Sequence, residues 1–551
     1  MNYKWEIKHQ YNNNLFEAKQ QDMGLDIDKF DDFINHVGKI RNPFQLKNMD
    51  KLVDRVQNAI LNNEKIMICA DYDVDGISAA SIMMLGLLQL TTNVSFSIPD
   101  RQKDGYGISK RQIDECIKNN VDLIITVDTG IAEHENIKYA QDNDIEVIVT
   151  DHHPWNSDTL PCEIAVDPFI DSNYEFPYIC GAMVAYKVIR ALIPELKKIN
   201  KDLNNQLIVL ATIATIADVM KLEDENRIFV YHGLKLIHQT NNYGINALLK
   251  LLKLDNKEVT ETDIGFSIAP CVNAVGRMEN AGQLVDMFLA DCEIDAEKIA
   301  KHAIMLNEKR KELTEKLMAQ IDIGKESFIV QVFNNVPAGL LGIAANKISH
   351  KYQRPCFALT KYGDRYGGSG RSILGYDISQ NIVQNKDLDI DGGGHSEACA
   401  MSINEKNFEE FKKRCNDSYL EFLASRSEND SHPILNVDFE INFCDINFKL
   451  IDQINQLRPF GQGNDEIKFC TKNINVLSKQ VFGRKKNALK FMLSHNNYEI
   501  PAICFNELKD YYLEQFDKST HIDMIYTISV NEFAGKKNIQ LLPIDFKDHD
   551  V

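Results

Sequence analysis

Three short apolar runs of this 551-residue sequence each end in acidic or imidazole side chains. The segments that follow the runs are DYDVDG at residues 71–76, DTG at 128–130 and DHH at 151–153. Short, mostly apolar runs are typical of buried parallel strands, and the carboxyl ends of parallel strands share one edge of a sheet, where ligands bind. We therefore expect these side chains, spread over about eighty positions, to converge in one pocket.

Carboxylates that face one another across a pocket repel and raise one another's pKa, and divalent cations remove that repulsion. A mixed Asp and His shell without thiolates favours Mn²⁺ or Mg²⁺ over structural zinc. Five or more ligands exceed what one Mg²⁺ usually takes from a protein. The sequence therefore predicts two ions about 3.5–4 Å apart, bridged by one carboxylate, that activate a water for in-line attack on a phosphodiester.

Each aspartate also has a second interpretation, because an Asp directly after a strand is a common N-cap of the next helix. We interpret the segment 71–75 as extended, so that Asp71, Asp73 and Asp75 point to the same side. In this interpretation Gly76 is the residue at which the chain turns away.

Alternating apolar runs and amphipathic segments between about residues 48 and 240 predict an α/β domain around a mainly parallel sheet. Residues 77–90 are expected to be helical, and a second helix begins at a capping box of Ser109 and Gln112. The apolar run 207–217 predicts a buried helix. Asp218, at its end, is either capped at the surface or paired with a cation.

Residues 295–321 have apolar residues near heptad spacing and predict one long helix that ends at Gly324 and connects two lobes. A second, glycine-rich α/β region follows at 326–425. The turn signals from Pro433 onward predict a small β-barrel. The polar first 45 residues are interpreted as an N-terminal extension packed on the main domain.

The net charge of −19 argues against a protein that coats duplex DNA, since neutralising phosphates needs clustered Lys and Arg. It does not exclude a nuclease, because metal cations supply positive charge locally. Residues 433–551 hold 14 basic and 16 acidic residues and are the segment least repelled by a polyanion. Cysteines without any CxxC pair, and the lack of a signal-type N-terminus or a membrane-length apolar stretch, lead us to expect a cytoplasmic protein.

Four segments resemble the motifs of the DHH phosphoesterases: ADYDVDGISAAS, VDTG, DHH and ATIADVM. The segments NAVGRMENA, GGSGRSI, DGGGHSEACA and LRPFGQGN resemble the RecJ family of single-strand exonucleases, and the resemblance runs from about Phe44 to the C-terminus. Three stretches depart from the usual family pattern, namely Asn335–Gly339, Cys399–Met401 and Asp465. None of the three contains an expected metal ligand.

The resemblance implies a mainly parallel DHH catalytic domain, a long connecting helix, a smaller α/β DHHA1 domain and a C-terminal OB-like barrel. The expected bounds are 1–45 for the extension, 46–290, 291–325, 326–430 and 431–551. The resemblance also implies a set of metal ligands: Asp73, Asp75, Asp128, His152 and Asp218, with Asp128 as the bridge. Asp71 and His153 are the expected catalytic support, and His153 is also expected to contact the scissile phosphate.

Expected substrate contacts lie outside the metal motifs. The segment 367–372 is interpreted as a flexible loop whose Ser369 and Arg371 hold a phosphate, and Arg277 as a second donor in a glycine-containing turn. The family implies that such residues grip the 5′-terminal phosphate. The segment 391–400 is interpreted as a turn into a helix, with His395 as a donor.

Arg101 and Tyr106 pair a cation with an aromatic ring that can stack on a base. In the barrel, the basic turns at 484–486 and 536–537, interleaved with Phe482, Phe491 and Phe533, favour a groove for single strands. The alternatives are a solvated surface charge for Arg277 or Arg371, a hinge at the Gly-Gly-Gly run of 392–394, a core position for Tyr106 and solvated hairpins in the barrel.

We interpret the sequence as a cytoplasmic, monomeric 5′→3′ exonuclease that degrades single-stranded DNA with two Mn²⁺ or Mg²⁺ ions, in repair and recombination. A helicase and a single-strand-binding protein are candidate partners. The first alternative is a DHH phosphodiesterase for cyclic dinucleotides or short oligonucleotides, which generally lacks such a barrel. The second is a non-catalytic replication scaffold, which the intact ligand positions disfavour.

Overall fold

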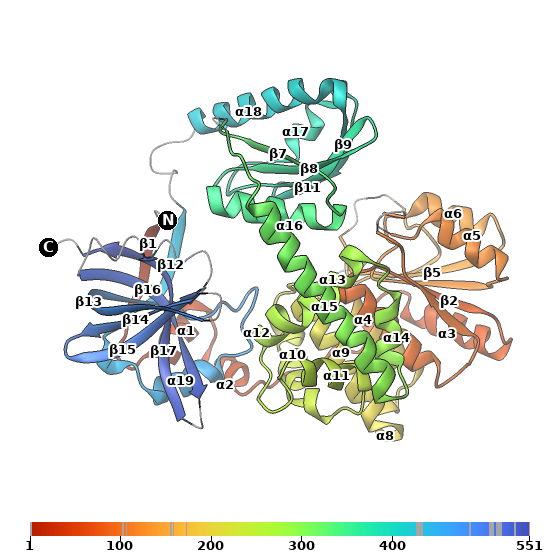
Figure 1. The fold of residues 1–551 in the computed structure, drawn as a ribbon. Helices are drawn as coiled ribbons and strands as arrows, with labels where there is room; N and C mark the ends of the chain where they lie inside the picture. Colours follow the sequence, from red (N-terminus) through yellow and green to blue (C-terminus); the bar gives the residue numbers. More distant parts are fainter. Residues whose placement is uncertain are drawn as a thin grey trace. The chain divides into compact units, whose positions relative to one another are not determined.

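The computed structural model describes residues 3–101, 104–105, 107–154, 157, 159–171, 173–324, 326–425, 433–483, 486, 488–505, 512–513, 521–533 and 536–549. The chain forms two compact units (Figure 1). The large unit is Lys39–Arg426, and the barrel unit combines Met1–Gly38 with Ser427–Val551. Within the described ranges, no helix is both long enough and apolar enough to cross a membrane.

The first lobe of the large unit contains a five-stranded sheet in which every pairing is parallel. The strand order is β3-β2-β4-β5-β6, with bounds β2 Ile66–Ala70, β3 Val94–Ser97, β4 Leu123–Val127, β5 Glu146–Thr150 and β6 Ile164–Val166. All side chains of β2 and β4 are buried, as their apolar sequences predict.

Alternate residues of these strands belong to two separate cores, because successive side chains point to opposite faces of a sheet. Ile68 and Ile125 belong to the larger core, and Met67 and Ile124 to the smaller one. Helices cover both faces: α3 Met49–Leu61, α4 Val74–Leu87 and α7 Gly181–Leu192 pack in the larger core, and α5 Lys110–Lys118 and α6 His134–Gln141 in the smaller one. The predicted capping box of Ser109 and Gln112 is present at α5.

Helices complete this lobe: α8 Leu196–Ile199, α9 Lys201–Ala217, α10 Asp224–Leu236, α11 Tyr243–Leu251, α12 Glu261–Asp263, the π-helical turn η3 Ile264–Ile268, α13 Ala269–Met278 and α14 Gly282–Leu289. The long helix α15 Glu293–Met318 contacts α11, α13 and α14 and also α16 of the second lobe, so it connects the lobes as predicted. Its predicted end is wrong, because the helix stops at Met318 and Gly324 lies beyond it at φ +54°.

The second lobe has a five-stranded sheet of order β10-β11-β9-β8-β7 in which only β7 and β8 run parallel. Its elements are β7 Ile329–Phe333, α16 Ala338–Tyr352, β8 Cys356–Tyr362, β9 Arg365–Arg371, α17 Gln380–Val383, β10 Ile390–Gly394, β11 Ala398–Asn404 and α18 Phe408–Ser425.

Both glycine-rich segments of this lobe are strands, which corrects two predictions. The segment expected as a flexible loop is β9, and the segment expected as a turn into a helix is the β10–β11 hairpin. A Cβ on Gly368 would lie 2.1 Å from the carbonyl oxygen of Ala358 on the neighbouring strand. The glycine there permits close strand packing, a reason that periodicity in the sequence does not reveal.

The barrel unit contains β12 Ile434–Glu440, α19 Phe448–Gln456, β13 Phe469–Phe482, β14 Ala488–His495, β15 Tyr498–Phe505, β16 His521–Phe533 and β17 Lys536–Asp548. Because β13 pairs with both β14 and β16, five strands close into the predicted barrel. Asn496 and Asn497, one of the turn signals that follow Pro433, join β14 to β15, with both residues at positive φ, as a two-residue hairpin requires. Phe491, expected beside a binding groove, is instead fully buried in the core.

The N-terminal segment belongs to this barrel unit, so the prediction that it packs on the main domain is wrong. Strand β1 Lys4–Gln10 pairs in parallel with β12, and the indole of Trp5 donates a hydrogen bond to Asp545 Oδ2 at 2.9 Å. Helices α1 Leu15–Asp22 and α2 Ile27–Ile34 contribute Leu15 and Phe30 to the barrel's core. Pairing over such a sequence distance leaves no local signal in the sequence.

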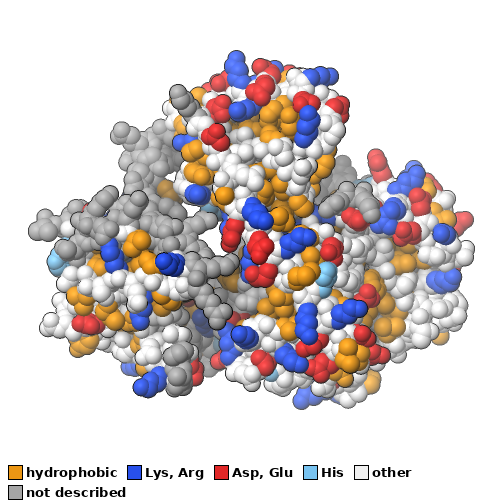
Figure 2. Space-filling model, viewed as in Figure 1, with side chains coloured by type: hydrophobic (Ala, Val, Ile, Leu, Met, Phe, Trp, Pro, Cys, Tyr) orange, Lys and Arg blue, Asp and Glu red, His pale blue; other side chains and the backbone are white. Residues whose placement is uncertain are grey.

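Acidic and basic side chains are interspersed over the face of the large unit that Figure 2 shows. The net charge of −19 is therefore not gathered into one acidic surface on this face. A separate concentration of carboxylates is buried at one edge of the parallel sheet.

Candidate metal centre

The three acidic motifs lie side by side because their strands are in register. Ala70 pairs with Val127, and Val127 with Thr150, so the residues that follow leave the sheet at the same edge. Three overlapping groups have ligand atoms within 4.8 Å of one another: Asp71, Asp73 and Asp128; Asp75, His152 and Asp218; and Asp128, His152 and His153. The predicted convergence is confirmed, and the role of each residue as a ligand stays a prediction.

The segment 71–75 reaches this edge differently from the prediction. It is not extended, because α4 begins at Val74 and Asp73 is its N-cap, accepting hydrogen bonds from the backbone N–H of Asp75 at 2.8 Å and Gly76 at 3.1 Å. Asp73 therefore combines the capping role with a place in the cluster. Gly76 lies within the helix rather than at a turn, and a Cβ there would lie 2.4 Å from the carbonyl oxygen of Asp71.

Asp75 is fixed by the start of a second helix. Its two carboxylate oxygens accept hydrogen bonds from the backbone N–H groups of Gly181 and Ala182, both at 2.7 Å, at the N-terminus of α7. A carboxylate is stabilised there because a helix N-terminus carries partial positive charge. Asp75 Oδ2 also lies 3.5 Å from His152 Nε2, so this helix end positions an edge of the cluster.

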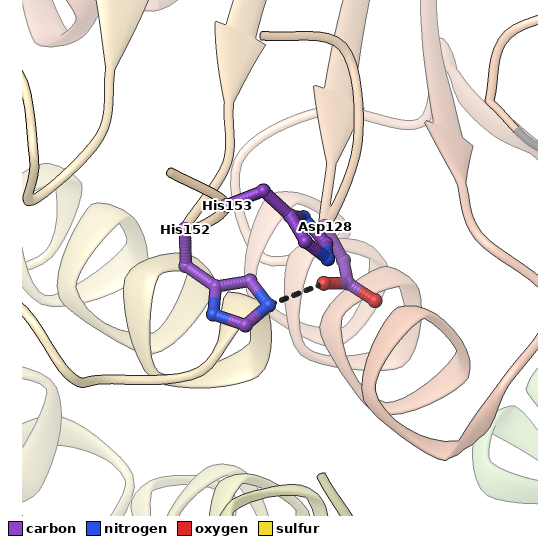
Figure 3. Close-up of side chains that lie close together, drawn as sticks. All are labelled: Asp128, His152 and His153. Atoms are coloured by element: carbon purple, nitrogen blue, oxygen red, sulfur yellow. Dashed lines mark ion pairs between the residues drawn. The ribbon is translucent and has the colours of Figure 1, made fainter. Parts of the chain in front are cut away.

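Asp128 lies at the centre of the cluster and is 3% exposed. Its backbone has φ +59°, a left-handed conformation that Asp tolerates better than most residues, and it directs the side chain toward His152 (Figure 3). Asp128 Oδ1 lies 3.1 Å from His152 Nε2. A Cβ on Gly181 would lie 2.6 Å from the Cβ of Asp128, so only glycine at position 181 leaves room for this carboxylate.

Asp218 is the C-cap residue of α9, the buried helix that the sequence predicts. Its Oδ2 lies 3.7 Å from His152 Nε2. A helix C-terminus carries partial negative charge, which disfavours a carboxylate and favours a nearby cation. The residue that follows, Val219, has φ +54°, a strained conformation for a β-branched side chain.

His153 is held by Asp151 rather than by the cluster. Its Nδ1 lies 2.7 Å from Asp151 Oδ1, and Asp151 also accepts the backbone N–H of Ile131 at 3.0 Å and of His152 at 2.7 Å. Burial lowers the pKa of His153, but the hydrogen bond to Asp151 and the charges of Asp151, Asp218 and Asp75 together outweigh burial and raise the pKa to about 9. The rings of His152 and His153 lie 4.4 Å apart between centroids (Figure 3).

The carboxylates in the cluster are hard to ionise together. Burial, with the charges of its acidic neighbours, raises the pKa of Asp71 to about 7, that of Asp218 to about 8, and that of Asp128 well above its ordinary value. Burial also lowers the pKa of His152. Asp71 Oδ1 and Asp128 Oδ1 are buried and accept no hydrogen bond from the described residues.

Such a donor set fits divalent cations. Oxygen ligands and a neutral imidazole suit Mn²⁺ or Mg²⁺, and the buried oxygens of Asp71 and Asp128 have lone pairs to offer. A cation would relieve the repulsion that raises these pKa values.

The expected substrate residues lie in several elements around this edge. Arg277 is in helix α13, not in the predicted turn, and its Nη1 donates to the carbonyl oxygen of Gly339 at 3.0 Å. The guanidinium carbon of Arg101 lies 4.9 Å from the ring centre of Tyr72. Tyr72 is the residue between Asp71 and Asp73 in the sequence. Tyr106, and with it Arg484 and Lys485 of the barrel, lies outside the described residues.

Ser369 and Arg371 lie on one face of β9, two residues apart, and both face Gly342 of α16. A Cβ on Gly342 would lie 3.4 Å from Arg371 Nη2 and 3.5 Å from Ser369 Oγ. His395 is exposed in the β10–β11 turn, and Ala398, three residues later, pairs with Arg371. The three expected contacts of the second lobe therefore lie near one another.

Arg101, Arg277 and Arg371 have no acidic partner among the described residues. In the part of the chain that the structure describes, no carboxylate lies within 4 Å of the guanidinium of Arg101, Arg277 or Arg371. Burial and the charge of Arg101 lower the pKa of Arg277 to about 10, and they lower the pKa of Arg371 as well. Partly buried, mutually repelling cations of this kind favour an anion between them.

Sequence reasoning missed Asp167, which follows β6 at the same sheet edge. It is 1% exposed, and burial raises its pKa to about 8, with a further contribution from Asp151. One oxygen accepts the backbone N–H of Phe169 at 2.7 Å, and the other has no hydrogen-bond partner among the described residues. The signal was available, since the run IAVD repeats the pattern of an apolar strand followed by Asp.

Comparisons with known proteins match all three parts of the chain. Family models match at residues 65–215 (DHH family, N-terminal domain), 325–420 (DHHA1 domain) and 437–545 (RecJ OB domain). The single-stranded-DNA-specific exonuclease RecJ of Haemophilus influenzae is 30% identical over 546 residues, which cover 92% of this chain and 92% of that protein. The chain belongs to the RecJ family.

Two further relatives extend this result. The RecJ exonuclease of Bacillus subtilis is 31% identical over 511 residues, or 91% of this chain, and the chain spans only 63% of the length of that relative. The crystal structure of RecJ in complex with Mn²⁺ from Thermus thermophilus superposes with a TM-score of 0.80 at 21% identity, covering 100% of this chain and 80% of that one. That structure supports the fold of this family member.

Proposed function

We propose that the protein is a metal-dependent 5′→3′ exonuclease that hydrolyses single-stranded DNA. The observation that carries the proposal is the cluster in which carboxylates from the ends of β2 and β4 and from the end of α9 surround His152, which follows β5. Curated members of the RecJ family are named single-stranded-DNA-specific exonucleases, which supports the same activity. The complete cluster argues against a non-catalytic scaffold.

Five residues would hold two Mn²⁺ or Mg²⁺ ions: Asp73, Asp75, Asp128, His152 and Asp218, with Asp128 central. When bound, such ions supply a water nucleophile at neutral pH and neutralise charge on the phosphodiester. The chain's own groups do the positioning. The N-termini of α4 and α7 orient Asp73 and Asp75, and Asp151 fixes the imidazole of His153 beside His152, where it can donate to a phosphate oxygen.

The 5′ polarity rests on the arginines that lack carboxylate partners. Arg277, Ser369 and Arg371 line the first turns of α16, whose N-terminus adds partial positive charge. A terminal phosphate has the charge and the acceptors that these donors need. Because Arg101 stacks on Tyr72, between Asp71 and Asp73, this anion site adjoins the metal centre.

The closed C-terminal barrel supports long single strands as substrates rather than cyclic dinucleotides. OB-type barrels bind single strands with basic grooves and aromatic platforms. The twelve cysteines show no disulfide, which supports a cytoplasmic location. We further infer a monomer that works with a helicase and a single-strand-binding protein.

The test uses single strands labelled at either the 5′ or the 3′ end, incubated with MnCl₂. We expect the 5′ label to be released first, as a mononucleotide, and faster from 5′-phosphate than from 5′-hydroxyl strands. Release of the 3′ label first would refute the polarity. No release of either label across a titration of Mn²⁺ and Mg²⁺ would refute the proposed activity, and Asp128→Asn controls for contaminating nucleases.

A further inference from the structure

Phe266 is the most exposed large hydrophobic side chain in the described part of the chain, at 82%. It lies in the middle of the π-helical turn η3, between Ile264 and Ile268, which are fully buried. The two isoleucines anchor the turn in the core and leave the phenyl ring on the opposite, outer side. An aromatic ring held in water on a rigid helix calls for an explanation.

The π-turn follows from the local sequence. The backbone N–H of Ala269 bonds to the carbonyl oxygen of Ile264, five residues back, and Pro270 has no N–H with which to continue the regular ladder. The backbone conformation of Phe266 is therefore set by residues on both sides of it. A ring presented in this way loses little conformational entropy when it binds a flat partner.

The turn packs against the helix end that carries Asp218. A Cβ on Gly265 would lie 3.9 Å from Ile216 Cγ2, two residues before Asp218. Val219, just after Asp218, is 63% exposed and is held at φ +54°. Strained backbone tends to persist where function requires it, and here it presents an aliphatic side chain beside the metal centre.

A cation and a second aromatic ring complete this surface. Lys221 Nζ lies 3.9 Å from the ring centre of Tyr178, which is 41% exposed. Asn226 Nδ2 donates to the carbonyl oxygens of both Tyr178, at 2.7 Å, and Lys221, at 3.0 Å, and so holds the two segments together. Two rings, an aliphatic group and a cation therefore lie on the turn that packs against α9 and on the segments tied to the residues after it. We call them the α9-end surface: Phe266, Val219, Tyr178 and Lys221.

We propose that the α9-end surface binds one nucleotide of the single strand whose phosphodiester is positioned at the metal centre, with Phe266 stacking on its base and Lys221 facing a phosphate. This inference rests on the proposed function and adds a base-binding site to it. Every base presents a π-face, so a stacking platform accepts any sequence, as a non-specific exonuclease requires. The surface pairs an apolar area with one positive charge, which matches a base and its phosphate.

The test measures binding in EDTA, where the strand is not cut. We expect Phe266→Ala to raise the Kd for a short oligo(dT) about ten-fold, the scale of losing one base–aromatic stack. The same variant should bind an abasic sugar-phosphate strand of equal length as wild type does. Phe266→Trp should restore the oligo(dT) affinity, and its added fluorescence should be quenched by oligo(dT) but not by the abasic strand.

Tyr362→Ala is the matched control, because Tyr362 is also an exposed aromatic residue but ends β8, where it pairs with Arg365 at the opposite end of β9 from Arg371. An equal loss in both aromatic variants, or an equal loss on normal and abasic strands, would overturn the stacking role. Unchanged Kd values in Phe266→Ala would also overturn it and would point to a protein as the occupant. If wild type neither binds nor cuts single strands, the proposed function itself fails, which is a different result.

Discussion

Asp128→Asn should separate two effects of the acidic cluster: the charge repulsion that destabilises the metal-free protein and the stabilisation that bound metal provides. Asparagine has the same size and also tolerates the φ of +59° found at this position, so the change removes a charge with little effect on the backbone. In EDTA the variant should be more stable than wild type, because the acidic cluster then loses its central repulsion. In Mn²⁺ the order should reverse, since the variant loses a central ligand.

The expected size follows from the spacing of the cluster. Two unit charges 4.8 Å apart interact by about 3.5 kcal/mol at an effective dielectric constant of ~20. The raised pKa values mean that proton uptake already relieves part of this repulsion, so we expect a gain of about 1–3 kcal/mol at pH 8. With free Mn²⁺ at a hundred times its Kd, each site should add about 2.7 kcal/mol to wild type.

The pH dependence has a definite sign. The folded-state pKa of Asp128 is raised, so the contribution of this group to the stability of wild type in EDTA is largest below about pH 4 and is lost as the pH rises and the buried carboxylate must ionise. The advantage of the asparagine variant should therefore be small near pH 4 and grow toward pH 8.

The assay is denaturant unfolding in EDTA and in MnCl₂ at several pH values, combined with strand cleavage. Asp144→Asn is the matched control, because Asp144 is exposed in the same lobe with φ +61° and should show neither effect. An Asp128→Asn protein that is less stable than wild type in EDTA, or that gains as much as wild type from Mn²⁺, would refute the electrostatic reasoning.

Three further predictions follow from the structure. Asp167→Asn should leave stability unchanged near pH 4 and raise it by up to a few kcal/mol near pH 8, because the pKa of about 8 makes ionisation costly in the folded state; unfolding curves that shift equally at both pH values would contradict this. Gly181→Ala should lower Mn²⁺ affinity at least ten-fold, since its Cβ would lie 2.6 Å from that of Asp128, and an unchanged metal titration by calorimetry would exclude the clash. A chain of residues 39–426 should fold, and relative to wild type it should lose more activity on long strands than on dinucleotides. A chain that lacks only residues 433–551 keeps β1 without its partner β12, and this variant should aggregate in size-exclusion chromatography.

The sequence predicts the sheet edge well because the signal there is local. An apolar run followed by Asp identifies both a buried strand and the end at which a ligand binds, and β2, β4 and β5 all follow that rule. The predicted backbone conformation of residues 71–76 was wrong. Whether this segment is extended or begins a helix depends on Asp73 capping α4 and on the N-terminus of α7 binding Asp75. Those are tertiary contacts, which spacing alone does not encode.

The predictions of a loop and a turn for the two glycine-rich segments were wrong for a related reason. Glycine in a sequence suggests a turn, yet at Gly368 and Gly392 it serves the close approach of neighbouring strands. Arg277 was placed in a turn by Gly276, whereas that glycine lets α13 approach the carbonyl oxygen of Tyr72, with a Cβ-to-oxygen distance of 2.5 Å. In each case the neighbour that requires glycine lies far away in the chain.

The pairing of β1 with β12 has a consequence for how the chain is made. Strand β1 is synthesised before the other described elements, but its partner β12 begins about 420 residues later, so this edge of β1 stays unpaired until those residues have been made. The large unit has all its strands by then and can fold while the first strand waits. Because β1 is synthesised early and pairs late, we expect chaperones to bind its unpaired edge. We also expect an affinity tag placed directly before β1 to disturb its pairing with β12.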